Sequence, residues 1–542
     1  MSARRLLWLA PAALVVGWYG VQAAQPGVTF FMEDPGYLSA ARIESLSDVV
    51  EVWTTTAAQR AGTFNYRPLG STVLGALAGL AGPVPQAFRL LNVATLAGLV
   101  ALVVALLRRF PMGPAATGLG ALALVLHPAV PDLLYWAVGH FDLLAALLVA
   151  GAMGVAGGER VAGRMGGASN AASTAEGSRL SWGRAALAVG LWIGACLAKE
   201  AAAPAIVPIL LVAQMSGGAR RIAGLAAPAG LAWLLAYLSV AESVPSAADL
   251  GPVLAALVQY AGMVVAYPPN QGGVYHLFDA GDVGLLATGA GVLAGGALLG
   301  VALLRGEGGA RGDGGQPAEG AERREAGRDL LRAGLTLTAM LVPAALAVQQ
   351  LVAQPSRYAL LPLVATLPFV VRATRALTGR SRAGVGAVVG LLLASHAVRA
   401  LPRPLVWTHE EALWRTEVLQ DPSYFHATLA ATQMARRPLD EAETALALDL
   451  LKQALATMPE PGTPALVQPC PVLDWSTYTA WCHGDPTDGI ARARVAVAAC
   501  RGQPADVGGP VRFSTCVLGG GADAPACPVD RPLCPPGSKQ AR

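Results

Sequence analysis

The sequence is poor in charged residues, and this shortage indicates the class of protein. Only 14% of its 542 residues are Asp, Glu, Lys or Arg, whereas soluble domains carry about 25%. Hydrophobic residues make up 54%. Stretches such as 90–107 and 285–304 have no interior charge and are long enough to cross the ~30 Å of a bilayer's hydrocarbon core. We therefore expect an all-α polytopic integral membrane protein embedded in a lipid bilayer.

The sequence also lacks a long run of Lys and Arg, so nothing in it predicts a nucleic-acid partner. It has no CxxC pair, and His483 beside Cys482 is poor spacing for zinc ligands. Six of the seven cysteines nevertheless crowd into the last part of the chain, at Cys470, Cys482, Cys500, Cys516, Cys527 and Cys534. An even set in a Pro/Gly-rich segment favours disulfides in an oxidising compartment over zinc and leaves the pairing open. Cys196, inside an apolar stretch, is expected to be a packing residue.

About eleven apolar stretches are candidates for membrane-spanning helices. They lie near 6–24, 90–107, 114–130, 142–157, 185–198, 203–216, 222–240, 284–304, 333–353, 359–371 and 384–400. The first follows Arg4-Arg5 and has the features of a signal peptide, but its apolar part is long and further spans follow. We interpret it as a retained signal anchor, with cleavage as the alternative.

The basic residues predict an orientation for these spans. With a cytoplasmic N-terminus and alternating crossings, the cytoplasmic segments hold twenty Arg residues and the opposite side holds seven Arg or Lys. This is the asymmetry of the positive-inside rule. The short stretch Leu69–Ala81 would invert the scheme if it crossed, so we expect a membrane-surface or re-entrant helix there. The C-terminus is then outside, in the periplasm if the membrane is a bacterial inner membrane.

Three regions follow from this organisation. Residues 1–400 form the membrane domain, with an external loop at 25–89 and flexible linkers at 158–183 and 305–328. Residues 401–460 are predicted to be helical, with amphipathic patterns over Thr408–Gln420, Ser423–Ala435 and Leu439–Thr457 that are typical of one or two TPR-like units. Residues 461–542 form a Cys-rich extracytoplasmic tail.

The predicted external loops collect acidic, basic and aromatic side chains on one face of the membrane. These residues are Glu33, Asp34, Tyr66, Arg67, His127, Asp132, Trp136, His140, Asp142, Lys199, Glu200, Arg357 and Tyr358. A carboxylate can act as a general base on a hydroxyl, and Arg or Lys can hold a phosphate leaving group. Each residue also has a structural interpretation, such as a helix cap for Glu33-Asp34, an interfacial anchor for Trp136, or an ion pair within Lys199-Glu200. Their concentration on one side favours a site.

Four ordered patterns in this chain resemble those of the GT-C superfamily of membrane glycosyltransferases, in its protein O-mannosyltransferase-like and transmembrane-and-TPR-containing branches. The first is FMED at 31–34 with YRPL at 66–69. The others are HPAVPDLLYWAVGHFDLLA at 127–145, similar to HPxxxExxxWxxGRxDLLA, CLAKE at 196–200, and RYALLP at 357–362. The resemblance covers about residues 1–430.

The resemblance implies an inverting transfer of a sugar, often mannose, from a polyprenyl-phosphate carrier to a hydroxyl of a protein or glycan acceptor on the external face. An acidic residue of the first loop serves as the base in this family. The corresponding pair here is Glu33 and Asp34, and we favour Asp34 because Asp is common at its position. No cofactor is implied with certainty, and a divalent metal requirement is left open.

Two positions depart from the family pattern. Asp132 stands where the family usually has Glu, and His140 stands where it has an Arg that would contact phosphate. Arg67, Lys199 and Arg357 are then expected to share the phosphate. Two other functions remain open at this point: a scaffold that has lost catalysis, and a transporter of a lipid-linked sugar, although paired internal repeats and mid-span charges typical of transporters are not evident.

Overall fold

The structure is a computed structural model, and nearly all of its regular structure is helical. It describes residues 7–31, 34–55, 66–110, 112–157, 180–240, 250–267, 275–305, 317–351, 353–376, 379–420, 423–458, 469–500, 513–514, 518 and 534. Besides helices, these residues contain two three-residue strands, β1 (Tyr275–Leu277) and β2 (Ala353–Pro355), which form one small sheet. The all-α prediction is confirmed at this level.

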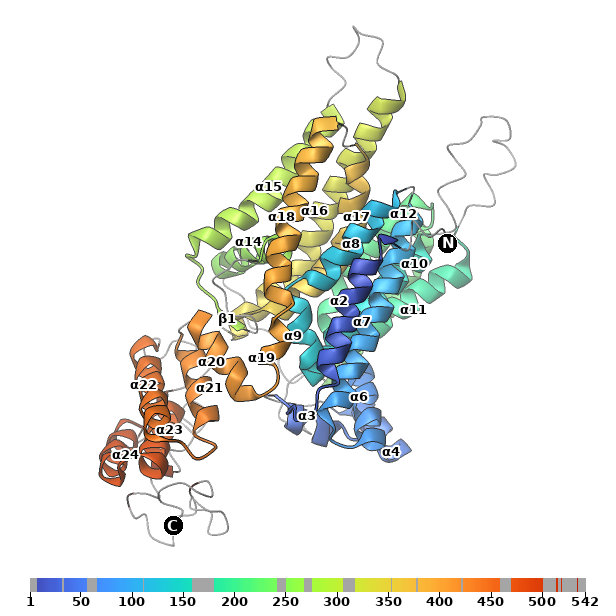
Figure 1. Cartoon of the computed structure of the whole chain (residues 1–542). Helices are drawn as coiled ribbons and strands as arrows, with labels where there is room; N and C mark the ends of the chain where they lie inside the picture. Colours follow the sequence, from blue (N-terminus) through green and yellow to red (C-terminus); the bar gives the residue numbers. More distant parts are fainter. Residues whose placement is uncertain are drawn as a thin grey trace. The chain divides into compact units, whose positions relative to one another are not determined.

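The chain divides into two compact units. Unit 1 comprises Met1–Pro269, Asp279–Gln349 and Gln354–Leu405, and unit 2 comprises Asn270–Phe278, Gln350–Ala353 and Val406–Arg542. The helices of unit 1, traced in Figure 1, are α2 (Ala10–Ala23), α3 (Asp34–Ala41), α4 (Leu46–Thr54), α6 (Pro68–Ala81), α7 (Pro85–Arg108), α8 (Pro114–Leu126), α9 (Ala129–Tyr135), η1 (Ala137–Gly139), α10 (His140–Ala156), α11 (Trp182–Ala198), η3 (Glu200–Ala205), α12 (Ile206–Met215), α13 (Ala219–Val240), α14 (Leu250–Val265), α15 (Val283–Arg305), α16 (Pro317–Leu351), η4 (Ser356–Ala359), α17 (Leu360–Ala373), η5 (Thr374–Ala376), α18 (Gly379–Ala400) and α19 (Arg403–Val406).

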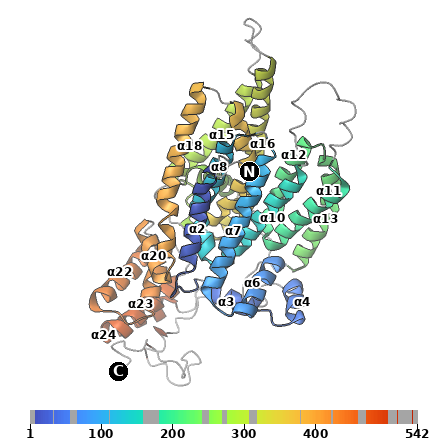
Figure 2. The same ribbon diagram turned by 45° about the vertical axis from the view of Figure 1, so that its right-hand side comes forward.

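Local sequence signals explain where several helices begin. Proline stands in the first turn of α6, α7 and α8, where its missing N–H costs nothing because that donor has no partner inside the helix. Ser45 and Asp48 form a capping box at the start of α4. Long apolar segments bounded by such signals pack side by side, so that α2, α7, α8 and α10 lie next to one another in both views (Figure 1 and Figure 2).

Six helices in the described part of the chain are long and apolar enough to cross a membrane. They cover Pro85–Arg108, Ala137–Ala156, Ala219–Ser239, Val283–Arg305, Gly320–Ala347 and Arg382–Val406. A seventh arises if Pro114–Leu126 and Ala129–Tyr135, bent by 58°, count as one span. Each of the eleven predicted apolar stretches falls mainly on a helix. The structure thus confirms the coarser prediction of several apolar helices that could span a membrane, while the count of eleven crossings stays a prediction.

Two sequence expectations differ from the structure. The linker expected at 305–328 is helical from Pro317 onward, because these residues continue directly into the apolar part of α16. Its remaining part, 306–316, and most of the linker at 158–183 lie outside the described residues. Helix α14, which has sixteen residues, was not among the predicted apolar stretches. The stretch Leu69–Ala81, expected to be helical but not to cross, is α6.

Helix α14 packs against α15 through two glycines. A Cβ built on Gly289 would lie 1.7 Å from the carbonyl oxygen of Val258, and one on Gly262 would lie 3.0 Å from the Gly289 nitrogen. The two backbones approach this closely only because neither residue has a side chain at the crossing.

We expect Gly289→Ala to destabilise the protein by about 1–3 kcal/mol, the usual cost of overpacking a tight contact. The matched control is Gly291→Ala on the same helix, where an added Cβ meets nothing within 4 Å. That variant is expected to be neutral or slightly stabilising, because Ala favours a helix over Gly by about 1 kcal/mol. Equilibrium unfolding in mixed micelles measures both, and equal stability of the two variants would contradict the proposed crossing.

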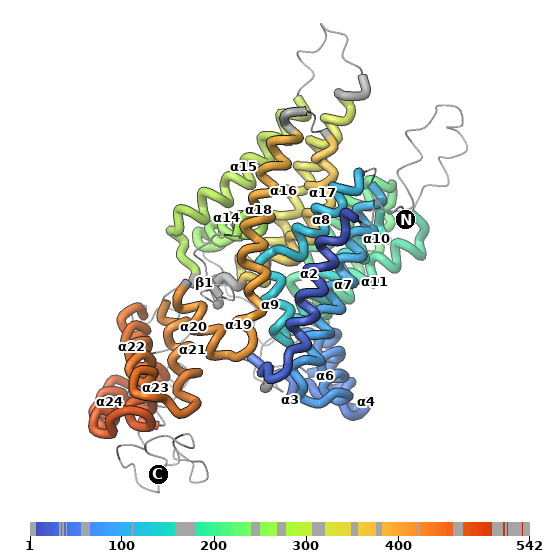
Figure 3. The backbone as a smooth tube through the Cα atoms, viewed as in Figure 1, coloured from blue at the N-terminus to red at the C-terminus, as the bar shows by residue number. Residues whose placement is uncertain are grey.

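The described part of unit 2 is largely helical and contains two disulfides. Its helices are α20 (Glu410–Gln420), α21 (Tyr424–Met434), α22 (Glu441–Thr457), α23 (Pro469–His483) and α24 (Pro486–Cys500), drawn from orange to red in Figure 3. Two cysteine pairs are bonded, Cys470–Cys500 between the ends of α23 and α24, and Cys482–Cys534. The disulfide prediction is confirmed for these four, and Cys516 and Cys527 lie outside the described residues. Cys196 is a buried free thiol in α11.

Candidate functional site

The predicted site residues come from chain segments that join helices at one end of unit 1. Helix α7 runs away from this end and α8 returns to it; α10 leaves it again and α11 returns (Figure 2). The segment His127–His140, which contains α9 and η1, therefore meets the turn Lys199–Glu200 at this end. The starts of α6 and α17 lie there too. Gly139 makes the first turn possible, because a Cβ there would lie 2.3 Å from the carbonyl oxygen of Leu133.

Arg67 and Glu200 form a two-pronged ion pair between α6 and η3. Arg67 Nε lies 2.8 Å from Glu200 Oε2, and Nη2 lies 2.6 Å from Oε1. The guanidinium also stands over the Phe141 ring at 5.5 Å. Parallel N–H···O bonds of this kind fix both side chains in orientation, so Arg67 is held beside the start of α10.

Lys199 and Asp142 form a second ion pair that is almost completely buried, with side-chain exposures of 2% and 4%. Lys199 caps α11 in an extended conformation, which turns its side chain toward α10. Its ammonium lies 4.8 Å from the centre of the Tyr358 ring. Burial lowers the pKa of Lys199 from its usual value, and the neighbouring Asp142 carboxylate opposes this shift.

Arg357 completes a row of three cations. Its guanidinium lies 4.3 Å from the centre of the Trp136 ring and 5.5 Å from that of Tyr358. Tyr358 therefore lies between Lys199 and Arg357. Three cations, Arg67, Lys199 and Arg357, and two carboxylates, Asp142 and Glu200, thus come from four separate segments and are flanked by aromatic rings. This composition is expected of a site for an anion that carries an apolar or sugar part.

Asp34 is buried against the turn that precedes α10. Its Oδ2 accepts hydrogen bonds from the backbone N–H groups of Phe31, at 3.3 Å, and Ala137, at 3.2 Å, and its Oδ1 accepts one from Val138 at 3.1 Å. The carboxylate thus joins the first loop to the residues directly after Trp136. The other candidate base, Glu33, lies outside the described residues.

His140 has a defined tautomer. Asn92 Nδ2 donates to the carbonyl oxygens of Leu133, Leu134 and Trp136 at 2.9–3.3 Å, so Asn92 Oδ1 must accept from His140 Nδ1–H at 3.1 Å. Nε2 then carries a lone pair, and this buried atom has no hydrogen-bond partner among the described residues. In this neutral form Nε2 would not attract an anion, and the predicted substrate-binding role of His140 stays a prediction.

Asp132 takes part in an ion pair within unit 1. Arg403 Nε lies 2.7 Å from its Oδ1, and Ser356 Oγ donates to its Oδ2 at 3.0 Å. Asp132 thereby fixes Ser356, the residue that precedes Arg357. The predicted substrate-binding role of Asp132 stays a prediction, and its contacts in the structure hold Ser356 and Arg403.

Two predicted residues have other surroundings. His127 is buried, its Nδ1 accepts from Ala129 N–H, and its Nε2 donates to the Met263 carbonyl at 3.3 Å. Its ring contacts the rings of His396 and Tyr267, and it belongs to a different group from the cations. Tyr66 donates its hydroxyl hydrogen to the Trp53 carbonyl at 3.0 Å, which braces the first loop.

Sequence reasoning missed Arg89, Asn92, Ser356 and Arg403 as members of this region. Arg89 donates to the Thr29 carbonyl at 3.1 Å and lies 5.5 Å from the centres of the Phe31 and Tyr135 rings. The available signal was that Arg89 and Asn92 are polar residues early in the long apolar helix α7, where burial demands a partner. Within the described ranges, no group of three or more His, Cys, Asp or Glu side chains could hold a metal ion.

In comparisons with protein-family models, curated proteins and solved structures, no family model, no curated protein and no solved structure matches this chain.

Proposed function

We propose that this protein is a GT-C-type membrane glycosyltransferase that transfers a hexose from a polyprenyl-phosphate carrier to a hydroxyl acceptor on the extracytoplasmic face. The observation that carries the proposal is the meeting of Arg67, Lys199 and Arg357 beside Trp136 and Tyr358. Cations can bind the phosphate and stabilise the charge that grows on it as the sugar leaves. Aromatic faces can stack on a sugar ring.

The proposed general base is Asp34. Its carboxylate is anchored to Ala137 and Val138, and the adjoining Trp136 ring is covered by Arg357. A base so anchored would approach the acceptor hydroxyl in a fixed orientation, as general-base catalysis requires. The unpartnered Nε2 of His140 would accept a hydrogen bond from a hydroxyl of the sugar or of the acceptor, in place of the phosphate contact that an Arg would make.

The proposed setting is the bacterial inner membrane, with the N-terminus in the cytoplasm and unit 2 in the periplasm. The excess of Arg in the predicted cytoplasmic segments supports this orientation. The two disulfides of unit 2 also fit an oxidising compartment. We further propose eleven crossings, and a TPR-like role for the hairpin of α20 and α21 in binding an acceptor.

The test is an assay of purified protein with a polyprenyl-phosphate hexose, in which release of polyprenyl phosphate is followed. Arg357→Gln is expected to raise the KM for the donor about 10- to 100-fold, because it removes a charge-assisted hydrogen bond worth about 1.5–3 kcal/mol. Arg42→Gln is the matched control, since Arg42 is an arginine of the first external loop whose side chain is 52% exposed. Lack of donor consumption by the wild-type protein would contradict the proposed activity, and equal KM values in both variants would contradict the role of Arg357.

A further inference from the structure

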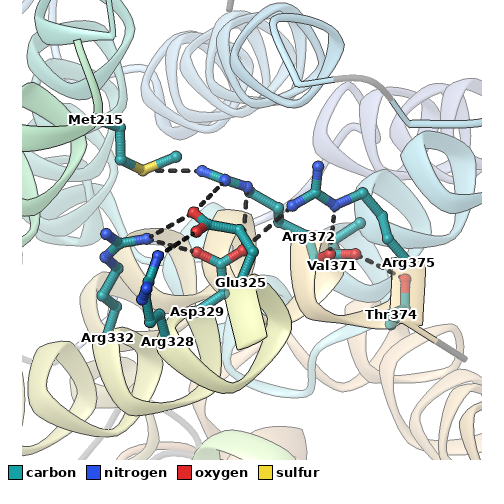
Figure 4. Close-up of polar contacts among 9 residues, drawn as sticks. All are labelled: Met215, Glu325, Arg328, Asp329, Arg332, Val371, Arg372, Thr374 and Arg375. Carbon is teal, nitrogen blue, oxygen red and sulfur yellow. Dashed lines mark hydrogen bonds and ion pairs between the residues drawn. The ribbon is translucent and has the colours of Figure 1, made fainter. Parts of the chain in front are cut away.

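A second concentration of charge lies at the far end of α17 from the candidate site. Helix α17 begins at Leu360, two residues after Tyr358, and ends at Ala373, so its fourteen residues separate the candidate site from Arg372 by about 20 Å. Figure 4 shows Arg372 between carboxylates of α16 and the sulfur of Met215. We define the arginine cluster as Arg328, Arg332, Arg372 and Arg375, with the carboxylates Glu325 and Asp329.

The two carboxylates are shared among four guanidinium groups. Arg372 Nη2 lies 2.7 Å from Glu325 Oε1, and Arg372 Nε lies 3.0 Å from Asp329 Oδ2. Arg332 Nη1 lies 2.9 Å from Asp329 Oδ1. Arg328 Nη1 lies 3.1 Å from Glu325 Oε2, and Arg375 Nη2 lies 3.5 Å from Asp329 Oδ2. Arginine stays protonated at all physiological pH values, so the cluster has two more positive than negative groups.

The unmatched positive charge is displayed by the outer arginines. In the described part of the chain, the side chains of Arg328 and Arg332 each donate through Nη1 alone, which leaves the Nε and Nη2 donors of both for another acceptor. The two residues are four apart on α16 and therefore lie on one face, one turn from each other. Their side chains are 58% and 17% exposed. Like charges at this spacing repel, and a bound anion would relieve that repulsion.

An apolar stripe continues from Arg328 along the same face of α16. Leu331 is 37% exposed, Leu335 is 55% exposed and Val342 is 40% exposed. These positions follow Arg328 by three, seven and fourteen residues, which is the repeat of a single helix face. A ligand that fits both parts would have an anionic head on the arginines and an apolar tail along the leucines.

We propose that the arginine cluster and this stripe bind one anionic phospholipid, with its phosphate on Arg328 and Arg332 and its acyl chains along Leu331, Leu335 and Val342. Within α16 the charged residues end at Arg332, and the residues that follow are mostly apolar. In a membrane-spanning helix this places the arginines at the level where headgroups meet hydrocarbon. A free phosphate would use the same donors, but it would not account for the exposed leucines.

The test is native mass spectrometry of the purified full chain in detergent, titrated with dioleoylphosphatidylglycerol. Arg328→Gln is expected to weaken lipid binding about fivefold, and Arg328→Gln combined with Arg332→Gln about 25-fold, from the contribution of each arginine near an anionic surface. Dioleoylphosphatidylcholine, which has no net charge, is expected to bind at least about tenfold more weakly than the anionic lipid.

The matched control is Arg323→Gln, which removes the same charge from the same helix at an exposed position about 140° around from Arg328. It is expected to leave the affinity unchanged. Equal loss in Arg323→Gln and Arg328→Gln, equal binding of the two lipids, or displacement of the lipid by inorganic phosphate would each overturn the proposal. The single variant Arg328→Gln keeps the test valid if the double variant is unstable, because Arg328 is the most exposed member of the cluster.

Discussion

Asp34→Asn is expected to lower turnover at least about a hundredfold, the usual loss when a general base is removed. An amide of the same shape cannot take the proton of an acceptor hydroxyl. The measurement is single-turnover transfer from a polyprenyl-phosphate hexose at saturating donor, which separates the chemical step from donor binding. The KM for the donor should change little, since the cations of the proposed phosphate site are untouched.

This prediction needs a control, because Asp34 also has a structural role. An Asn side chain would turn one NH2 group toward the backbone donors of Phe31, Ala137 or Val138, and part of any loss could come from a displaced loop. Asp48→Asn is matched to it: Asp48 also lies between α2 and α6 and accepts backbone N–H bonds from Glu44 and Ser45 at 2.8 Å. It should cost about 1 kcal/mol as a lost helix cap and leave turnover intact.

The base assignment can fail in distinguishable ways. Full turnover in Asp34→Asn together with a large loss in Glu33→Gln would move the role of base to Glu33. Full turnover in both variants would exclude a base in this pair. A loss in Asp34→Asn that is matched by an equal fall in thermal stability, and equalled by Asp48→Asn, would leave Asp34 as a structural residue only.

The second large effect is expected at the buried ion pair of Lys199 and Asp142. Lys199→Met alone should destabilise the protein by about 3–5 kcal/mol, because the Asp142 carboxylate then remains buried without its counter-charge. Asp142→Asn should have a similar cost, because the Lys199 ammonium then remains buried without a carboxylate. The double variant Lys199→Met with Asp142→Leu should recover most of the loss, since apolar residues of similar size often replace a buried ion pair without penalty.

Equilibrium unfolding in mixed micelles measures this cycle. The control is Arg42→Met, which breaks an exposed pair with Glu44 whose side chains are 52% and 66% exposed. Such pairs contribute at most about 1 kcal/mol. If both single variants also stay within about 1 kcal/mol of the wild type, Lys199 and Asp142 are not buried as a pair. The recovered double variant should still lack activity if Lys199 binds the donor phosphate.

The sequence by itself indicated a protein built from long apolar helices, and it identified the segments that carry the candidate site residues. The charge-free stretches are long enough to identify apolar helices without knowledge of their neighbours, because burial in a bilayer is a property of each segment. The even set of tail cysteines likewise indicated disulfides, although not their pairing. The motifs also named Asp34, Arg67, Lys199 and Arg357 as residues to examine.

Only the tertiary structure decided what these residues contact. The pairing of Arg67 with Glu200 and of Lys199 with Asp142 joins segments that are far apart in the chain, and no local pattern encodes such contacts. As an alternative to a phosphate-binding role, the sequence offered a pair of Lys199 with its neighbour Glu200. The tautomer of His140 depends on Asn92, which in turn is held by three carbonyl groups, so it could not be read from a motif.

The same reason accounts for α14 and for the arginine cluster. Helix α14 was not among the predicted apolar stretches, and its backbone packs closely on α15 at the glycine crossing. Arg372 and Asp329 are 43 positions apart and meet only because α16 and α17 pack together. Hydropathy and motifs are properties of a single segment, so they can be recognised in the sequence. Ion pairs, tautomers and close crossings depend on which segments become neighbours, and the folded structure alone determines that.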